Sequence, residues 1–158
     1  MVQWKCTMST YLWRFLLMAE KTIFELIHSF EQVNHKMIVR WKSKSAHDLG
    51  ISHIIVLHEL RQDGESRPSD LAKRLGFTPA SLTHLSTKLA NQELITRRQD
   101  DLDRRTTYWT ITEKGIALLD QAQKDGHATR GELFSHLTEE EQETLLAIYQ
   151  KLEQSLQD

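Results

Sequence analysis

The stretch from residue 95 to residue 115 constrains the fold of this chain more than any other part of it. Two short runs of β-forming residues, 95–99 and 106–112, lie on either side of a charged tip, and this pattern predicts a two-stranded antiparallel hairpin. Arginine side chains fit the narrow minor groove of DNA, and neighbouring carboxylates can hold them in place when DNA is absent. A hairpin of this kind therefore indicates a DNA-binding element. Its charged tip residues are Asp100, Asp101, Asp103, Arg104 and Arg105.

The chain before the hairpin shows helical patterns. Apolar residues recur with helical spacing from residue 20 to about residue 42, which predicts one long amphipathic helix. Ser52 is the expected N-cap of a short apolar helix that follows. A third helix is predicted over residues 69–75, with Pro68 at its start and Gly76 as its C-cap.

A fourth helix is expected from Pro79 to about Gln92, with Thr78 as its N-cap. After the hairpin, one helix is predicted to begin near residue 113 and a last one at residue 138, where Thr138–Glu141 forms a capping box. The predicted fold class is thus mainly α with a small β-hairpin wing. It is a winged helix-turn-helix flanked by N- and C-terminal dimerisation helices, whose leftover apolar faces a second subunit would cover.

The first residues are unlike the rest of the chain. Residues 1–17 are rich in aromatic side chains, and Met18 begins a stretch that resembles an ordinary protein start. Two interpretations stay open: translation begins at Met18, or the upstream residues add helical turns that pack on a partner subunit. The predicted parts are an N-terminal extension (1–19), a dimerisation helix (20–48), a winged helix-turn-helix DNA-binding region (49–115) and C-terminal dimerisation helices (116–158).

The charge distribution agrees with a DNA partner, although the net charge of the chain is −2. Residues 67–114 carry nine basic and six acidic side chains, and this segment is therefore positive while the remainder is negative. The single cysteine excludes an internal disulfide and suits the reducing cytoplasm, where we expect the protein. The longest apolar stretch near the N-terminus, 11–19, is interrupted by Arg14 and too short to span a membrane, so no membrane partner is expected.

Several segments together resemble the MarR family of winged helix-turn-helix transcription regulators. They are Leu49–Ser52, Arg67–Leu75, and the Asp103-Arg104-Arg105 tip followed by the Ile111–Gly115 segment, which is the most specific. The likeness runs from about residue 20 to the C-terminus. It implies an obligate homodimer with interlocked terminal helices, a palindromic double-stranded DNA operator, and a small-molecule or redox signal that releases the DNA. We expect a repressor, and a small aromatic or phenolic molecule as its effector.

The resemblance also implies which residues contact DNA. Residues 79–91 would form the recognition helix, and Arg105 would enter the minor groove with Asp103 positioning it through Arg97 or Arg98. Those two arginines are expected to bridge to carboxylates or phosphates. Many family members have glycine at the position of Glu93, so Asn91, Gln92 or Glu93 must close the helix here, with Asn91 proposed for the left-handed conformation. The expected DNA-binding residues are Ser69, Ala80, Ser81, Thr83, His84, Thr87, Lys88, Arg98, Asp103, Arg104 and Arg105.

Other classes of function have weaker support. No Gly-rich phosphate loop, Gly-x-Ser-x-Gly motif or metal-protease signature occurs, so an enzyme is not expected. A metal- or thiol-responsive regulator of the same fold is an alternative, but the eight histidines do not show a His-x-x-x-His pair, and Cys6 lies far from the position of sensor cysteines in relatives. A helical protein–protein adaptor that does not bind DNA is the remaining alternative. No cofactor or metal ligand is assigned.

Overall fold

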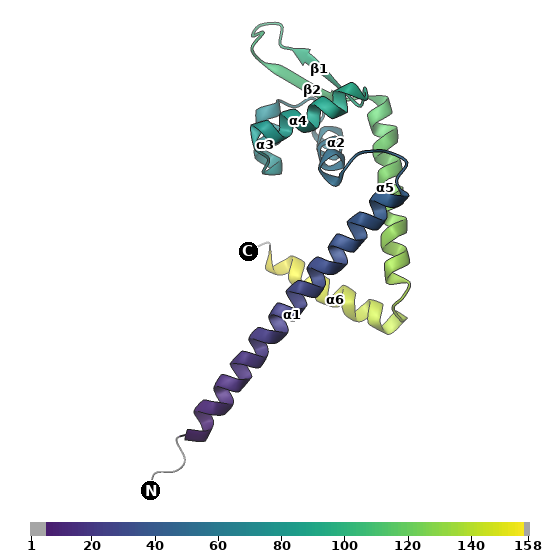
Figure 1. Cartoon of the computed structure of the whole chain (residues 1–158). Coiled ribbons are helices and arrows are strands. Elements are labelled where there is room, and N and C mark those ends of the chain that lie inside the picture. Colours follow the sequence, from purple (N-terminus) through teal and green to yellow (C-terminus); the bar gives the residue numbers. More distant parts are fainter. Residues whose placement is uncertain (1–5, 157–158) are drawn as a thin grey trace. The chain divides into compact units, whose positions relative to one another are not determined.

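The computed structural model describes the backbone of residues 6–156 and the side chains from residue 21 to residue 156 (Figure 1). The chain divides into two compact units, residues 1–40 and 41–158. The elements in chain order are α1 (Cys6–Lys44), α2 (Ile51–Asp63), α3 (Pro68–Leu75), α4 (Pro79–Asn91), β1 (Ile95–Gln99), β2 (Thr107–Ile111), α5 (Glu113–Phe134) and α6 (Glu139–Ser155). The expected fold class is confirmed.

The first helix begins earlier than the sequence pattern predicted. α1 starts at Cys6, not near Glu20. Residues 6–19 contain neither proline nor glycine, so nothing in their sequence prevents helix formation in front of the amphipathic stretch. The two interpretations of residues 1–17 stay predictions, and residues 1–5 lie outside the described part of the chain.

The predicted N-cap of α2 is wrong. Gly50 occupies this position with an extended backbone, and Ser52 lies inside the first helical turn. The Gly50 N–H donates to Nδ1 of His53 (3.3 Å), while the His53 N–H donates to the Gly50 carbonyl (3.0 Å). His53 therefore performs the role that the glutamate has in a capping box.

Other predicted helix ends are confirmed. Thr78 Oγ1 accepts a hydrogen bond from the Ser81 N–H, and Thr138 and Glu141 form the expected reciprocal capping box. Gly76 closes α3 in the left-handed conformation (φ 66°). These ends depend on neighbouring residues in the chain, and sequence spacing is therefore enough to find them.

The left-handed residue after α4 is Glu93 (φ 60°), and the proposal that Asn91 takes this conformation is wrong. The Leu94 N–H donates to the Leu89 carbonyl and the Glu93 N–H to the Ala90 carbonyl, both at 2.9 Å. This is the hydrogen-bond pattern of a Schellman motif, in which the residue two positions beyond the last helical residue is left-handed. Since α4 ends at Asn91, that position falls on Glu93.

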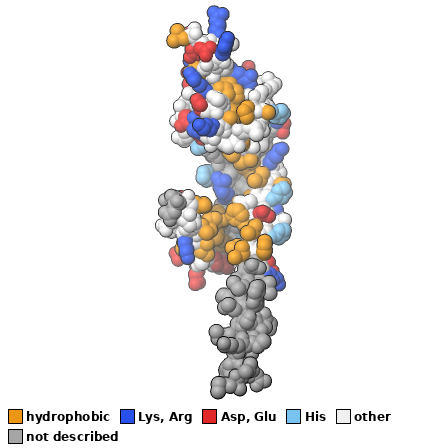
Figure 2. Space-filling view, turned by 90° about the vertical axis from the view of Figure 1, so that its left-hand side faces the viewer, with side chains coloured by type: hydrophobic (Ala, Val, Ile, Leu, Met, Phe, Trp, Pro, Cys, Tyr) orange, Lys and Arg blue, Asp and Glu red, His pale blue; other side chains and the backbone are white. Residues whose placement is uncertain are grey.

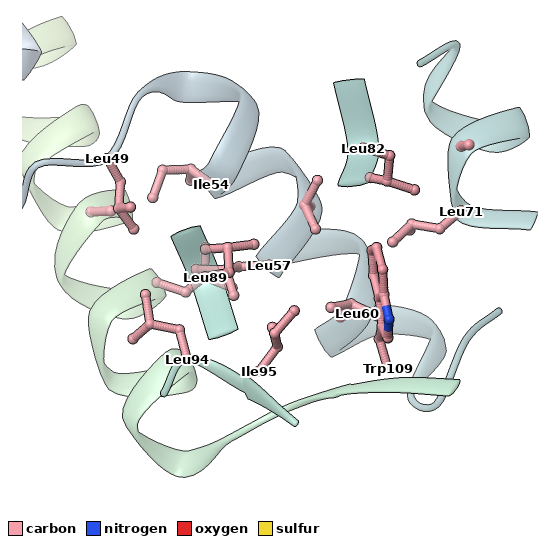
Figure 3. Close-up of a cluster of buried hydrophobic side chains, with 14 of the residues drawn as sticks. Leu49, Ile54, Leu57, Leu60, Leu71, Leu82, Leu89, Leu94, Ile95 and Trp109 are labelled. Carbon is pink, nitrogen blue, oxygen red and sulfur yellow. The ribbon is translucent and has the colours of Figure 1, made fainter. Parts of the chain in front are cut away.

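A single apolar core joins the helix-turn-helix to the hairpin (Figure 3). Leu57 and Leu60 of α2 are fully buried, as is Leu89 of α4, and Trp109 of β2 is 5% exposed. In Figure 3, Trp109 lies beside Leu60 and Leu71, the latter on α3. The same core includes Leu119 and Ala122 of α5. The orientation of the hairpin relative to α3 and α4 is therefore fixed by packing.

The base of the hairpin is attached to the start of α5. The Thr112 N–H donates to the Leu94 carbonyl (3.0 Å), and Thr112 Oγ1 donates to the Glu93 carbonyl (2.8 Å). Gly115 lies so close that a Cβ atom on it would be 2.2 Å from the Leu94 carbonyl oxygen. Glycine allows this close approach of the two backbones without strain, because the Leu94 carbonyl oxygen is held by a hydrogen bond and cannot move aside without an energetic cost.

The hairpin strands are close to the predicted runs. β1 matches residues 95–99, and β2 is one residue shorter at each end than the expected 106–112. Thr106 instead donates its N–H to the Asp103 carbonyl within the tip (2.8 Å), and Thr112 serves as the N-cap of α5. Beyond the hairpin partners, Ser66 forms a two-way backbone bridge with Trp109, which connects the α2–α3 turn to β2.

Candidate DNA-binding site

The outer face of α4 carries small polar side chains, as its spacing predicts. The hydroxyl groups of Thr83 and Thr87 donate to the carbonyls of Pro79 and Thr83, both at 2.8 Å, which leaves their oxygen lone pairs free to accept. Such a face can approach base edges closely. The exposed residues that were expected to contact DNA on this helix are Ala80, Ser81, Thr83, His84 and Thr87, and Lys88 is half-buried.

Ser86 is a residue of α4 that the sequence analysis missed. It is fully buried, and its Oγ accepts a hydrogen bond from Arg97 Nη2 (3.0 Å) while donating to the Thr83 carbonyl (2.9 Å). The guanidinium of Arg97 also lies over the Trp109 ring, 5.6 Å from its centroid. Ser86 lies four residues after Leu82 and three before Leu89, so helical spacing could have placed it on the buried face. Arg97 thus connects β1 to α4.

The carboxylates at the hairpin tip bind its backbone. Asp100 Oδ1 accepts the N–H groups of Leu102 (2.9 Å) and Asp103 (3.0 Å), and these bonds lower the pKa of Asp100. Asp103 accepts the Arg105 N–H (3.0 Å) and the Thr106 hydroxyl (3.1 Å). The expected pairing of Asp103 with Arg97 or Arg98 is therefore wrong: Asp103 shapes the loop directly.

The tip displays its arginines to solvent. Arg104 and Arg105 are both exposed. Figure 2 shows basic, acidic and hydrophobic side chains together at the outer end of the hairpin, at the top of the view. Because hydrogen bonds hold the loop that carries them, these cations are presented from a defined backbone.

Arg98 pairs with a carboxylate, which is one of the two kinds of partner expected for it, the other being a phosphate. Its Nε and Nη2 donate to the two Glu65 oxygens at 3.0 and 2.9 Å, and this pairing lowers the pKa of Glu65. The guanidinium groups of Arg67 and Arg98 each lie 5.3 Å from the centroid of the Tyr108 ring. Arg67 also donates Nε and Nη2 to the Tyr108 hydroxyl (3.0 and 2.9 Å). This cluster stabilises the hairpin against the α2–α3 turn.

A cleft of about 300 Å³ lies between the start of α3 and the hairpin. Ser69 and Arg105, which lie far apart in the sequence, both line it. The full lining is Arg67, Pro68, Ser69, Arg105, Thr106 and Thr107. Two guanidinium groups and several hydroxyls in one open cleft form a surface that favours an anion.

Two other findings concern the described residues alone. Within residues 21–156, no group of three His, Cys, Asp or Glu side chains could hold a metal ion, and Cys6 is not among the side chains described. No helix in the described part of the chain has the length and hydropathy needed to cross a membrane.

Comparisons with known proteins agree with this geometry. The MarR family model matches residues 49–107, from the start of the α2 region to the hairpin. The HTH-type transcriptional regulator MhqR of Bacillus subtilis (strain 168) is 32% identical over 123 residues, which cover 78% of this chain and 83% of MhqR.

Solved structures show the same fold. A MarR variant from E. coli, crystallised with operator DNA, has a TM-score of 0.65 at 25% identity, covering 83% of this chain and 95% of that one. The organohalide-sensing regulator RdhR, bound to 2,4-dichlorophenol, has a TM-score of 0.69 at 25% identity, covering 85% of this chain and 80% of that one. The sequence and structural matches share one fold and one class of function, which is not enzymatic. The chain therefore belongs to the MarR family of DNA-binding transcription regulators.

Proposed function

We propose that this protein binds a palindromic operator as a homodimer and represses transcription until a small aromatic effector releases the DNA. The observation that carries the proposal is the combination of an exposed, small-residue face on α4 with a hydrogen-bonded hairpin tip that displays Arg104 and Arg105. The first element suits a major groove and the second a minor groove.

The two DNA-contacting elements have different roles. Ser81, Thr83 and His84 on α4 are proposed to meet base edges, while Ser69 on α3 meets a phosphate. Arg105 enters the minor groove, and Asp103 positions it through the backbone of the tip. Arg98 is proposed to stabilise the hairpin through Glu65 and to approach the phosphates from its side.

Exposed apolar side chains support the homodimer. α6 has no buried residue, although Leu146, Tyr149 and Leu152 are among its exposed apolar side chains. The described part of α1, considered by itself, exposes a second apolar set. A second copy of the chain would cover such faces, and a two-fold dimer reads a palindrome. The α1 set is Ile23, Phe24, Leu26, Ile27, Phe30, Val33, Ile38 and Val39.

The proposal of an aromatic effector is supported by RdhR, whose structure contains 2,4-dichlorophenol. Repression is the simplest mode of action, because a dimer bound across a promoter excludes other proteins from the same DNA. We assign this activity to the cytoplasm, in keeping with the single cysteine and with a DNA partner.

The test removes the proposed minor-groove contact. A duplex that binds the wild-type protein is selected from a random-sequence pool, and its affinity for the Arg105→Ala variant is measured by fluorescence anisotropy. We expect at least about ten-fold weaker binding with an almost unchanged Tm, because Arg105 is exposed. Arg130→Ala, which removes an exposed arginine from α5, is the charge-matched control. Equal affinity of the two variants would contradict the proposed role, and no enrichment from the pool would contradict DNA reading altogether.

A further inference from the structure

The only lysine or arginine of the recognition helix is already bound within the protein. Lys88 Nζ donates to Asp48 Oδ2 (2.8 Å) and to the Asp48 backbone carbonyl. Asp48 lies between α1 and α2, forty residues from Lys88 in the sequence. Two oxygens of this connecting segment thus accept hydrogen bonds from the ammonium group that was expected to bind DNA.

The pair lies at the surface and is open to competition. The Asp48 side chain is 81% exposed and that of Lys88 is 33% exposed. The hydrogen bond from Lys88 lowers the pKa of Asp48, which is therefore ionised at neutral pH. A phosphate of the DNA backbone offers Lys88 the same kind of anionic oxygen, so the two acceptors are alternatives for one cation.

The segment that carries Asp48 is anchored on both sides. Trp41 Nε1 donates to the Ala122 carbonyl of α5 (3.1 Å), and Leu49 is fully buried. Gly50 is held by His53, as described above. Asp48 is therefore presented to Lys88 from a fixed backbone.

We infer that Asp48 is an intramolecular competitor for DNA, which holds Lys88 in the free protein and releases it to a phosphate when the operator binds. This inference rests on the proposed function and adds a regulatory contact to it. The competitor belongs to the segment that connects α1 to the helix-turn-helix. A displacement of this segment would therefore change the DNA affinity without altering α4 itself.

The experiment compares four variants on one DNA. The probe is the duplex selected from the random pool with wild-type protein, and its affinity is measured at several salt concentrations. The variants are Asp48→Asn, Lys88→Gln, the double variant, and Asp120→Asn. Asp120 pairs with Arg61 across α2 and α5 (2.5 Å), so its replacement removes an equal charge and an ion pair away from α4. Asp48→Ser repeats the test with a second neutral side chain.

We expect Asp48→Asn to bind the duplex about three-fold more tightly per subunit, hence about ten-fold per dimer, than Asp120→Asn. The slope of log K against log salt should stay the same in Asp48→Asn, because Lys88 reaches a phosphate in both proteins. In Lys88→Gln it should become shallower by about 0.9 per subunit, because one phosphate contact is lost. In the Lys88→Gln background, the Asp48→Asn effect should disappear. The Tm of each variant is measured beside its affinity.

The possible failures are distinguishable. If Asp48→Asn and Asp48→Ser bind like Asp120→Asn or more weakly, Asp48 is a structural partner of Lys88 and the competition is refuted. The competition is also refuted if Asp48→Asn still increases the DNA affinity in the Lys88→Gln background. If no duplex is enriched by the wild-type protein, the proposed function fails, and this inference fails with it.

Discussion

Gly115→Ala tests the attachment of the hairpin to α5. The added methyl group would lie 2.2 Å from the Leu94 carbonyl oxygen and 2.8 Å from Ile111 Cγ1. Relieving this overlap costs about 1–3 kcal/mol, and weakening the bond from the Thr112 N–H to Leu94 costs about 1 kcal/mol more. Alanine regains about 1 kcal/mol because it favours a helix. We therefore expect the free energy of unfolding to fall by about 2 kcal/mol, which corresponds to a Tm lower by roughly 4–8 °C.

Gly131→Ala is the matched control for this prediction. Gly131 lies in the same helix, and nothing is within 4 Å of the position its Cβ would take, so the substitution should be neutral or stabilising by up to about 1 kcal/mol. Thermal and urea unfolding would be compared at equal protein concentration, because the stability of the proposed dimer would depend on concentration. Similar unfolding of the two variants would refute the close approach of α5 to the hairpin base.

Two further substitutions test local features of the fold. Glu93→Gly should raise the free energy of unfolding by about 1 kcal/mol, because it removes a left-handed non-glycine residue and loses only an exposed pair with Lys114. The control Glu143→Gly, within exposed α6, should lower it by a similar amount. A shift of both variants in the same direction would contradict the assignment of the turn at Glu93. Burial and the nearby Lys88 lower the pKa of His53 below 6.5. As the pH falls, this histidine therefore binds a proton in the unfolded chain before it does so in the folded protein. The free energy of unfolding should thus fall as the pH drops below about 6.5. His53→Gln should remove the part of this stability loss that comes from His53, which is less than about 1.4 kcal/mol per pH unit since the ring is partly exposed. Urea unfolding of both proteins at pH 7.5 and 5.5 measures the difference. Equal pH dependence of the two proteins would contradict a lowered pKa of His53.

Features that depend on neighbours in the chain could be predicted from the sequence. The caps at Thr78, Gly76 and Thr138 and the strand at 95–99 are local, and residue type and spacing determine them. The cap at Gly50 was missed because a histidine side chain, which is an uncommon partner at this position, completes it. The start of α1 at Cys6 could not be located from the sequence because no capping signal marks it, and added helical turns before residue 20 were only one of two open interpretations.

The partners of the charged residues could not be predicted in the same way. The pairs Lys88–Asp48, Arg98–Glu65 and Arg97–Ser86 join residues on different elements. Sequence spacing shows that these residues are polar and which face of a helix they occupy. It does not show which distant side chain faces them once the core has packed. The exposed face of α4 was therefore predictable, whereas the involvement of Lys88 in an internal pair was not.

The most direct test of the account is the binding of the purified protein to fluorescent DNA from upstream of its own gene. Random duplex serves as competitor, and the titration is done at two salt concentrations. A dimeric, sequence-specific regulator should bind this DNA tightly, with two chains per duplex, and resist the competitor at the higher salt. Weak binding that random DNA displaces equally well, and that is lost at the higher salt, would contradict specific recognition of this DNA.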